Sequence, residues 1–288
     1  MADEQRFPSP IDLHTHSSVS DGTQTPAELV EAAKDAGLGT VALTDHDSTG
    51  GWAEAAGAAA RAGIRLIPGM ELSTRYDGWK SVHMLAYLFD PDDAAITAET
   101  ARIRRARLTR AEAIVQKLSV DYGLTWDDVL AHTTPGASIG RPHIADALVS
   151  NGIVDSRSAA FETLLHPAGG YYQQLYAPTP LEGVALIAGA GGVAVLAHPV
   201  TYGRKNALPE SYFAQLIDAG LAGLEIDHRE NTEDGKAYLR ELARRNDLIV
   251  TGSSDYHGAG KPNRLGENTT SVESLERIVA AATGSRPI

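Results

Sequence analysis

Histidines and carboxylates recur in this chain at the ends of short apolar runs, where they could bind metal ions. The densest of these segments are His14-Thr15-His16, Asp45-His46 and Asp255-Tyr256-His257. Residues two apart on a strand point the same way, so His14 and His16 can share one ion. Asp255 and His257 have the same spacing. Imidazole and carboxylate ligands without sulfur suit manganese, iron or zinc, and the chain contains no cysteine that could supply a thiolate or a disulfide.

The same kinds of side chain follow or lie in other apolar runs. These further candidate ligands are Glu71, His83 and His198. A lone histidine is more often a hydrogen-bonded core residue than a ligand, and a single His-x-His pair carries little weight. A whole set of ionisable groups at strand ends is different, because burying unpaired charges is strongly unfavourable. The set exceeds the ligands of one ion, so we expect two or three ions, with Glu71 able to bridge a pair.

Short apolar runs that alternate with helical stretches must position these ligands. The expected strands are residues 11–13, 40–43, 65–67, 82–88, 193–196, 224–226 and 248–250. Capping boxes at Thr25-Pro26-Ala27-Glu28 and Thr179-Pro180-Leu181-Glu182 predict the starts of two helices. Strand–helix alternation favours parallel strands, in a barrel or a doubly wound sheet. In a parallel barrel all carboxyl ends open on one face, where the ligands would meet.

The alternation stops between Asp90 and Pro178. A long charged helix is expected over residues 95–119, followed by shorter helices around residues 126–132, 142–151 and 156–165. We interpret residues 91–178 as a mainly helical insertion that caps an α/β body formed by residues 11–90 and 179–288. The alternative is that this stretch belongs to the body and contains strands that the sequence does not reveal.

The composition is that of an ordinary soluble protein. The 288 residues are 43% hydrophobic and 22% charged, and 25 basic against 37 acidic residues give a net charge of −12. This acidic balance disfavours binding to duplex DNA or to an anionic membrane. The first ten residues, MADEQRFPSP, lack the apolar stretch of a signal peptide, and no apolar run reaches the length of a membrane span. We therefore expect a cytoplasmic protein.

Taken together, the ligand segments resemble the motifs of the PHP (polymerase and histidinol phosphatase) family. The matching segments are residues 12–17, 20–23, 43–47, 68–71, 82–83 and 254–257. They spread over most of the body, about residues 11–88 and 192–257. The resemblance implies an α/β fold, a distorted (β/α)7 barrel with a metal cluster at its C-terminal mouth and a mainly helical inserted cap domain.

The resemblance also implies ligand sets, residue by residue. The first ion would be held by His14, His16, Glu71 and Asp255, the second by Glu71, His83 and His198, and the third by Asp21, His46 and His257. Some family members have a histidine at the position of Asp21, which leaves the occupancy of the third site open. His46 and His257 could instead bind phosphate or act as acid and base.

Clustered divalent ions would make this a hydrolytic centre. They lower the pKa of bound water, and two ions about 3.5–4 Å apart can hold a hydroxide and polarise a phosphoryl or carbonyl oxygen. In-line attack on phosphorus would follow, and a protonated His257 or His46 could help the alkoxide leave. The candidate catalytic residues are therefore His257, His46 and Asp255. Asp45 is expected to orient a ligand histidine.

Substrate selection is expected from the insertion and the loops. Gly140-Arg141-Pro142-His143 lies at a predicted helix start, which offers free amide groups to an anion, and arginine can bind phosphate through two hydrogen bonds. Arg141 and His143 are thus candidate substrate residues. His228 follows a strand end from which it could reach the site.

Other polar residues of the insertion are interpreted more conservatively. The arginines from Arg102 to Arg110 are expected to form a solvated helix face, and the alternative is that some of them contact phosphate. Three tyrosines, Tyr171, Tyr172 and Tyr176, could stack on a base or pack at the edge of the insertion.

A PHP subgroup with a helical insertion is similar to this chain in length, in the position of the insertion and in the Ala-His-Pro that follows it. That subgroup includes 3′,5′-nucleotide bisphosphate phosphatases and enzymes that trim short RNA from the 5′ end, and a similar Arg-x-His pair lies near nucleotide phosphates. The resemblance implies a phosphomonoester hydrolase that removes the 3′-phosphate of a small 3′,5′-nucleotide bisphosphate, with short oligoribonucleotides as further candidate substrates. The alternatives are a histidinol-phosphate phosphatase, a metal-dependent amidohydrolase and a non-catalytic PHP module.

Overall fold

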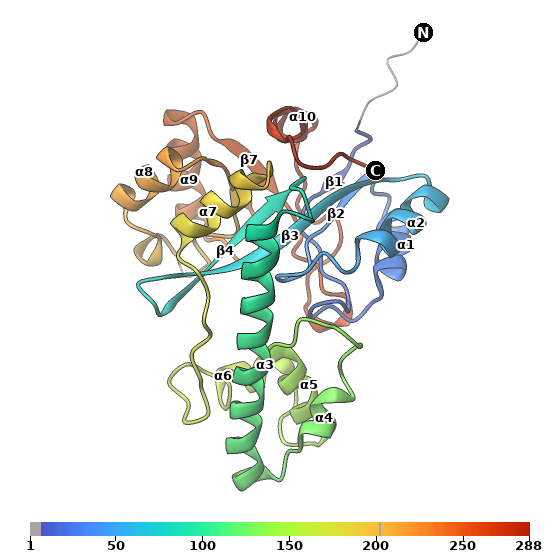
Figure 1. The fold of residues 1–288 in the computed structure, drawn as a ribbon, viewed down its shortest axis with the longest axis vertical. Coiled ribbons are helices and arrows are strands. Elements are labelled where there is room, and N and C mark those ends of the chain that lie inside the picture. The colour runs from blue at the N-terminus through green and yellow to red at the C-terminus, as the bar shows by residue number, and fades with distance from the viewer. Residues whose placement is uncertain (1–6, 202) are drawn as a thin grey trace.

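Seven strands form one sheet in sequence order in the computed structural model, which describes residues 7–201 and 203–288. The strands are β1 (Ile11–Asp12), β2 (Thr40–Leu43), β3 (Arg65–Tyr76), β4 (Lys80–Tyr87), β5 (Val193–Leu196), β6 (Leu221–Asp227) and β7 (Ile249–Gly252). A parallel bridge between Thr15 and Tyr256 joins the segments that follow β1 and β7. The sheet is thereby nearly closed, and the expected α/β barrel is confirmed (Figure 1).

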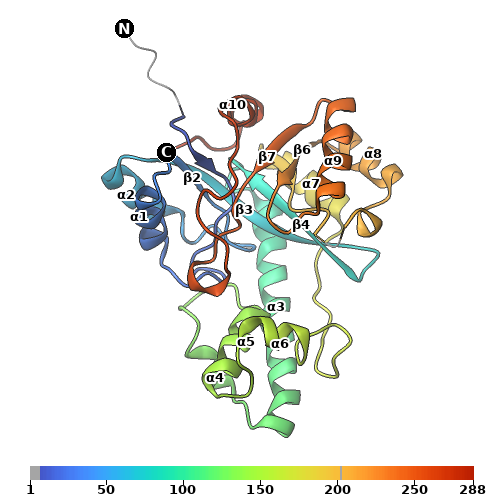
Figure 2. The same cartoon turned by 180° about the vertical axis from the view of Figure 1, so that it is seen from behind.

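Helices cover the outside of this sheet (Figures 1 and 2). They are α1 (Pro26–Asp35), α2 (Trp52–Ala62), α7 (Pro180–Gly189), α8 (Glu210–Asp218), α9 (Glu233–Arg245) and α10 (Val272–Ala281), with two short 3-10 turns at Arg204–Asn206 and Gly258–Gly260. Thr25 and Glu28 cap α1 reciprocally, and Thr179 and Glu182 do the same for α7, so both predicted capping boxes are confirmed. No helix in the described part of the chain is both long and apolar enough to cross a membrane.

Strand β4 departs from the expected parallel arrangement. It pairs in antiparallel orientation with both β3 and β5, whereas the other four strand pairs are parallel. Strand β3 also continues to Tyr76, so Glu71 lies inside this strand. We had expected Glu71 to follow the end of the strand. Asp77 (φ 50°) and Gly78 (φ 71°) form a tight turn, and such a turn can join neighbouring strands only in antiparallel orientation. The reversal brings the first half of β4, with His83, to the mouth of the barrel.

Residues between β4 and α7 form a helical region at one end of the molecule (Figure 1). Its helices are α3 (Ala94–Tyr122), α4 (Trp126–Leu130), α5 (Arg141–Ser150) and α6 (Arg157–Glu162). Apolar side chains of this region, including Leu118, Leu124, Val129, Ile144 and Leu148, pack into a cluster of their own. Residues 91–178 contain no strand, so the alternative of unrecognised strands there is wrong. The boundaries of the proposed cap domain stay a prediction.

The arginines of α3 are not one solvated face. Arg102 and Arg105 are exposed, as expected, but Arg107 is only 8% exposed. Its Nε donates to Asp47 Oδ2 at 2.8 Å and its Nη2 donates to Ser73 Oγ at 2.7 Å. Ser73 in turn donates from its backbone N to Asp47 Oδ1 at 2.7 Å. Arg107 lies on the buried side of α3, four residues after Ile103, and there it finds a carboxylate of the barrel.

Removing one partner of this buried ion pair should be costly. We expect Arg107→Met to lower the free energy of unfolding by about 3–5 kcal/mol, because Asp47 would keep a buried charge without its counter-ion. Arg105→Met on the exposed side of the same helix should change it by less than about 0.5 kcal/mol. Urea unfolding of both variants measures the difference. Equal stabilities would contradict the role assigned to the pair.

Candidate metal centre

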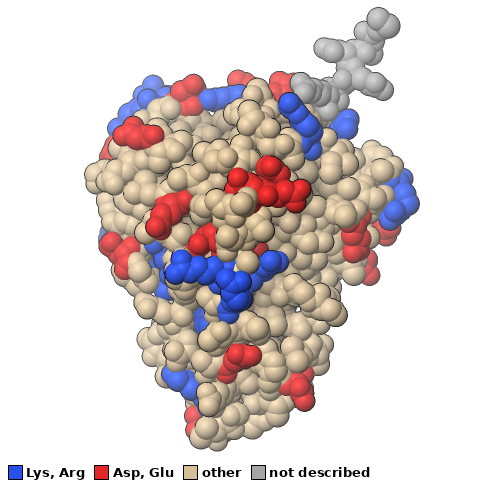
Figure 3. All heavy atoms as spheres, viewed as in Figure 1, with Lys and Arg blue, Asp and Glu red and all other residues tan. Residues whose placement is uncertain are grey.

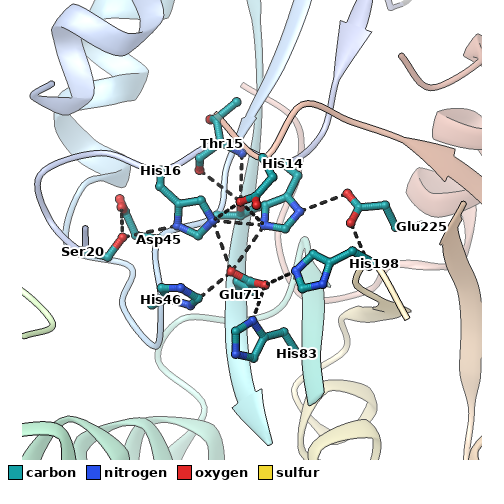
Figure 4. A network of polar contacts seen from close by, with 12 residues as sticks. His14, Thr15, His16, Ser20, Asp45, His46, Glu71, His83, His198 and Glu225 are labelled. Atoms are coloured by element: carbon teal, nitrogen blue, oxygen red, sulfur yellow. Dashed lines mark hydrogen bonds and ion pairs between the residues drawn. The ribbon is translucent and has the colours of Figure 1, made fainter. Parts of the chain in front are cut away.

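Glu71 lies at the centre of the predicted ligands, which meet at the mouth of the barrel (Figure 4). The atoms around its Oε2 are His14 Nε2 at 3.3 Å, His16 Nε2 at 3.2 Å and His46 Nδ1 at 3.1 Å. Its Oε1 lies 2.8 Å from His83 Nδ1 and 3.3 Å from His198 Nε2. Each carboxylate oxygen therefore faces its own set of imidazoles, the arrangement that a ligand bridging two ions requires.

Three groups of possible donors have ligand atoms that all lie within 4.8 Å of one another. They are His14, His16, Glu71 and Asp255; His16, Asp21, His46 and His257; and His46, Glu71 and His83. The first group matches the expected first ligand set, and the second contains the whole expected third set. In the last group His46 stands where His198 was expected, although His198 also contacts Glu71. The structure thus brings all nine predicted ligands together, in slightly different combinations.

The donor atoms in these groups fit cations better than they fit one another. His14 Nε2 and His16 Nε2 are 3.0 Å apart, and each lies 3.4 Å from Asp255 Oδ1. Three further buried atoms, Asp21 Oδ1, His46 Nδ1 and His257 Nε2, lie near opposite charges but make no hydrogen bond of acceptable geometry with the described residues. Buried polar atoms without partners are costly, and a metal ion would satisfy them. Imidazoles and carboxylates without sulfur suit manganese, iron or zinc.

Burial and neighbouring charges shift the pKa values of the centre. Burial alone would raise the pKa of Glu71, but His46, His83 and His14 hold it well below its ordinary range. Burial would lower the pKa of His16, but Asp255 and Glu71 raise it to about 9. The carboxylates therefore stay ionised, and a metal ion that binds here displaces protons from histidines.

The pKa values of His46 and His257 shift in the opposite direction from that of His16. Burial lowers the pKa of His46 well below its ordinary value, and burial and Lys261 lower that of His257. His257 Nδ1 lies 2.8 Å from the backbone oxygen of Asp255, which can only accept, so the ring proton sits on Nδ1. Nε2 of His257 is then free to bind a cation or to take up a proton, and it faces Asp21 Oδ1 at 3.2 Å.

Backbone strain accompanies the ligands at several strand ends. Asp47 after β2, His198 after β5 and Asp255 after β7 have positive φ angles of 54°, 28° and 54°. Residues other than glycine rarely adopt such angles, and strain of this kind is concentrated at functional sites. At these three positions the unusual backbone angles turn the polypeptide sharply at the mouth of the barrel, where the ligand side chains converge.

Two residues that the sequence analysis missed, Glu225 and Lys261, contact the ligands and hold them in place. Glu225 on β6 is fully buried; its Oε1 lies 3.0 Å from His14 Nδ1, and its Oε2 accepts from the backbone N of His198 at 3.0 Å. Lys261 Nζ lies 2.6 Å from Asp255 Oδ2. The sequence does contain a signal for Glu225, because a carboxylate inside the apolar run Leu224-Glu225-Ile226 is unusual in a buried strand.

Asp45, which was expected to orient a ligand histidine, does so only indirectly. It accepts hydrogen bonds from the backbone N of Ser17 at 2.8 Å and from Ser20 Oγ at 2.7 Å. Ser20 Oγ lies 3.4 Å from His16 Nδ1. Asp45 therefore acts on His16 through the serines of the loop that follows β1.

The predicted substrate residues lie in two parts of the structure, Arg141 and His143 in the helical region and His228 beside a ligand of the barrel. Arg141 begins α5, donates from Nη1 to Leu165 O at 3.2 Å and packs against Tyr172, with its Cζ 5.7 Å from the ring centre. His143 is buried and accepts from the backbone N of Gly140 at 3.1 Å through Nδ1. His228 is fully buried, and its Nε2 lies 3.6 Å from Asp255 Oδ2. His228 is thus placed against a metal-ligand candidate, while Arg141 belongs to the helical region.

Hydrogen bonds tie the helical region to the loop that follows β1. Ser138 donates from its backbone N to Val19 O at 2.9 Å, and Thr134 donates from Oγ1 to Ser18 O at 2.7 Å. The start of α5 is thereby fixed beside the loop that carries Asp21.

Comparison with known proteins points to one family. The family model that matches is the PHP domain, over residues 12–122. A 3′,5′-nucleoside bisphosphate phosphatase of Chromobacterium violaceum is 36% identical over 256 residues, 88% of this chain and 89% of the relative. A 5′-3′ exoribonuclease of Haemophilus influenzae is 32% identical over 265 residues, 92% of this chain and 96% of the relative.

A solved structure supports the same assignment. The crystal structure of a protein assigned as a metal-dependent phosphoesterase, from Bifidobacterium adolescentis, is 42% identical. It superimposes with a TM-score of 0.92 and covers 96% of this chain and 98% of that one. With its donor groups, its barrel and these relatives, the chain belongs to the PHP family of metal-dependent phosphoesterases.

Proposed function

We propose that this phosphoesterase is a phosphomonoesterase that removes the 3′-phosphate of a 3′,5′-nucleotide bisphosphate. The observation that carries the proposal is the convergence of three donor groups around Glu71, next to a helical region that presents Arg141 and His143. The similarity to a relative named as a nucleoside bisphosphate phosphatase supports the choice of substrate. Residues 91–178 would act as the cap domain over that substrate.

The centre would hold two or three divalent ions, manganese, iron or zinc. Such ions supply a Lewis acid for the phosphoryl oxygen and a hydroxide near neutral pH. Glu225 keeps a proton on His14 Nδ1, which leaves Nε2 of His14 as a donor directed at Glu71 and Asp255. The two oxygens of Glu71 would each face a different set of histidine ligands. Lys261 forms an ion pair with Asp255 and so partly neutralises that ligand.

The remaining residues would handle the substrate. Arg141 and His143 would bind a phosphate oxygen at the start of α5, where backbone amides also point outward. His257 or His46, whichever is not a metal ligand, would give a proton to the departing 3′-oxygen. His228, fully buried beside Asp255, would act on the substrate only through that carboxylate. We expect the protein to work in the cytoplasm on small nucleotides or short oligoribonucleotides.

A substrate panel tests this proposal. Protein reconstituted with Mn²⁺ should release phosphate from adenosine 3′,5′-bisphosphate, leave adenosine 5′-monophosphate as product, and show no turnover after chelation. The panel should also contain histidinol phosphate, an amide substrate and a 5′-phosphorylated trinucleotide. Turnover of histidinol phosphate or of the amide alone would reject the nucleotide assignment, and turnover of the trinucleotide alone would favour RNA trimming.

Variants of two carboxylates should distinguish a residue that binds metal, Glu71, from a residue that orients a metal ligand, Glu225. Glu71→Gln should lose bound metal and lower kcat by roughly 10³-fold or more, because it removes the charge shared by two ligand sets. Glu225→Gln should weaken metal affinity by about 10–100-fold but recover most of its kcat in excess Mn²⁺, because it only orients His14.

Metal analysis and metal titration of activity measure both effects. Glu233→Gln, at an exposed carboxylate of α9, is the matched control and should behave like wild type. A Glu71→Gln variant with full metal content and normal turnover would be incompatible with the bridging role.

A further inference from the structure

An ion pair inside the helical region lies against the barrel. Arg157, the first residue of α6, bonds through Nε and Nη2 to both carboxylate oxygens of Asp146 on α5. Both side chains are largely buried, with 17% of Arg157 and 23% of Asp146 exposed. Asp146 lies three residues after His143, on the same face of α5. The pair therefore joins α5 to α6, and it leaves Nη1 of Arg157 for another contact.

This third nitrogen of Arg157 faces two loops of the barrel that carry candidate metal ligands. Nη1 donates to the backbone oxygen of Asp21 at 3.4 Å, in the loop after β1. The same guanidinium group lies directly against Gly260, in the loop after β7, since a Cβ atom at this glycine would overlap it. Gly260 donates from its backbone N to His257 O at 3.2 Å. Figure 2 shows the loop after β7 extending from the barrel toward the helical region.

The two loops are also bonded to each other. Thr23 donates from its backbone N to His257 O at 3.2 Å, and its Oγ1 accepts from the backbone N of Ala259 at 2.9 Å. Beside this contact, Asp21 Oδ1 lies 3.2 Å from His257 Nε2. Both atoms belong to the donor group of His16, Asp21, His46 and His257, here called the outer cation site. Arg157 thus contacts the two loops that supply half of the donors of this site.

The loop of Asp21 is held by the helical region from a second side as well. Residues 134 and 138 bond to the backbone oxygens of Ser18 and Val19. Loops are the most mobile parts of a fold, whereas ligand atoms must be placed to within about 0.5 Å. A largely buried ion pair that packs against the loops provides the support that they lack on their own.

We propose that Arg157 is a positioning residue that couples the helical region to the outer cation site. By holding the loops of Asp21 and His257 it sets the separation of two donors, and a cation bound between them in turn fixes the helical region on the barrel. Coupling between two such events is reciprocal by thermodynamic necessity. Arg157 acts through the loops, because its described contacts are with a carboxylate of α5, a backbone oxygen and a glycine. The inference does not depend on which phosphate ester is hydrolysed.

Titration of the metal-free protein with Mn²⁺ tests the effect of Arg157 on the site. Asp21→Asn identifies the outer cation site as the Mn²⁺ whose binding this variant weakens or abolishes. Arg157→Gln should raise the Kd of the same Mn²⁺ about 10–100-fold, as loss of a residue behind a ligand does, and should leave the other bound Mn²⁺ within about twofold. Arg157→Lys should recover part of the affinity. An unchanged outer site, equal weakening of all sites, or an Asp21→Asn variant that loses no Mn²⁺ would overturn the proposal.

Hydrogen exchange measures the reciprocal effect without any turnover. In wild-type protein Mn²⁺ should slow amide exchange in residues 138–163 by about 5–150-fold, the usual range for coupled sites. This protection should largely disappear in Arg157→Gln. Asp21→Asn, which leaves the ion pair intact, should exchange like wild type without metal and should gain no protection from Mn²⁺, so it carries the test even if Arg157→Gln does not fold. An arginine with only a structural role would speed exchange by the same factor with and without Mn²⁺, and that result would refute the coupling.

An arginine elsewhere at the same junction provides the control for charge. Figure 3 shows lysine and arginine side chains gathered at mid-height on the α3 side, where the helical region meets the barrel. Arg105 of α3 is exposed, and the structure describes no contact between it and either loop. Arg105→Gln should therefore match wild type in its outer cation site and in its metal-dependent exchange. A loss as large as that in Arg157→Gln would indicate a long-range effect of charge and would contradict the positioning role.

Discussion

The carboxylate of Glu71, with five imidazoles around it, is the contact on which the rest of the molecule depends. Its two oxygens lie within 3.3 Å of nitrogens that come from β4 and from the segments after β1, β2 and β5. Polar groups packed this closely cost free energy unless something binds them all. A barrel can bring such distant segments together because its strand ends converge, and bound metal ions would compensate the cost. The stability of the barrel mouth and the binding of metal are therefore expected to depend on each other.

The β3–β4 hairpin serves both the metal centre and the approach to it. Because β4 is reversed, its first half and the last half of β3 lie side by side at the mouth, with Ser73 opposite His83. Along β3, Glu71 faces the ligands, Ser73 bonds to Arg107 of α3, and Arg75 reaches Tyr172. One strand face thus runs from the metal ligands into the helical region, and its side chains change from acidic to hydroxyl to basic.

How much of this the sequence reveals depends on whether a contact is local. The ligands were predictable because their types and two-residue spacing are local, as were the capping boxes at Thr25 and Thr179. Strand direction was not, since apolar periodicity is the same in both directions, and only the Asp77-Gly78 turn indicated the reversal. Glu225 escaped notice because it lies in an apolar run that predicts an ordinary strand. The partner of Arg107 is sixty residues away in sequence, and no local pattern could identify it.

Arg107 and Arg110 of α3 have different surroundings although they share one helix face. Both lie on the same face of α3, but Arg107 is saturated by Asp47 and Ser73 and so fixes the helix to the barrel. That fixed contact sets the position of Arg110 one turn further along, where no carboxylate competes for it among the described residues. An arginine that fixes one buried element to another needs its counter-ion in the protein, because a buried charge without a partner is costly. The distribution of carboxylates, more than that of arginines, therefore decides which arginine of α3 anchors the helix to the barrel.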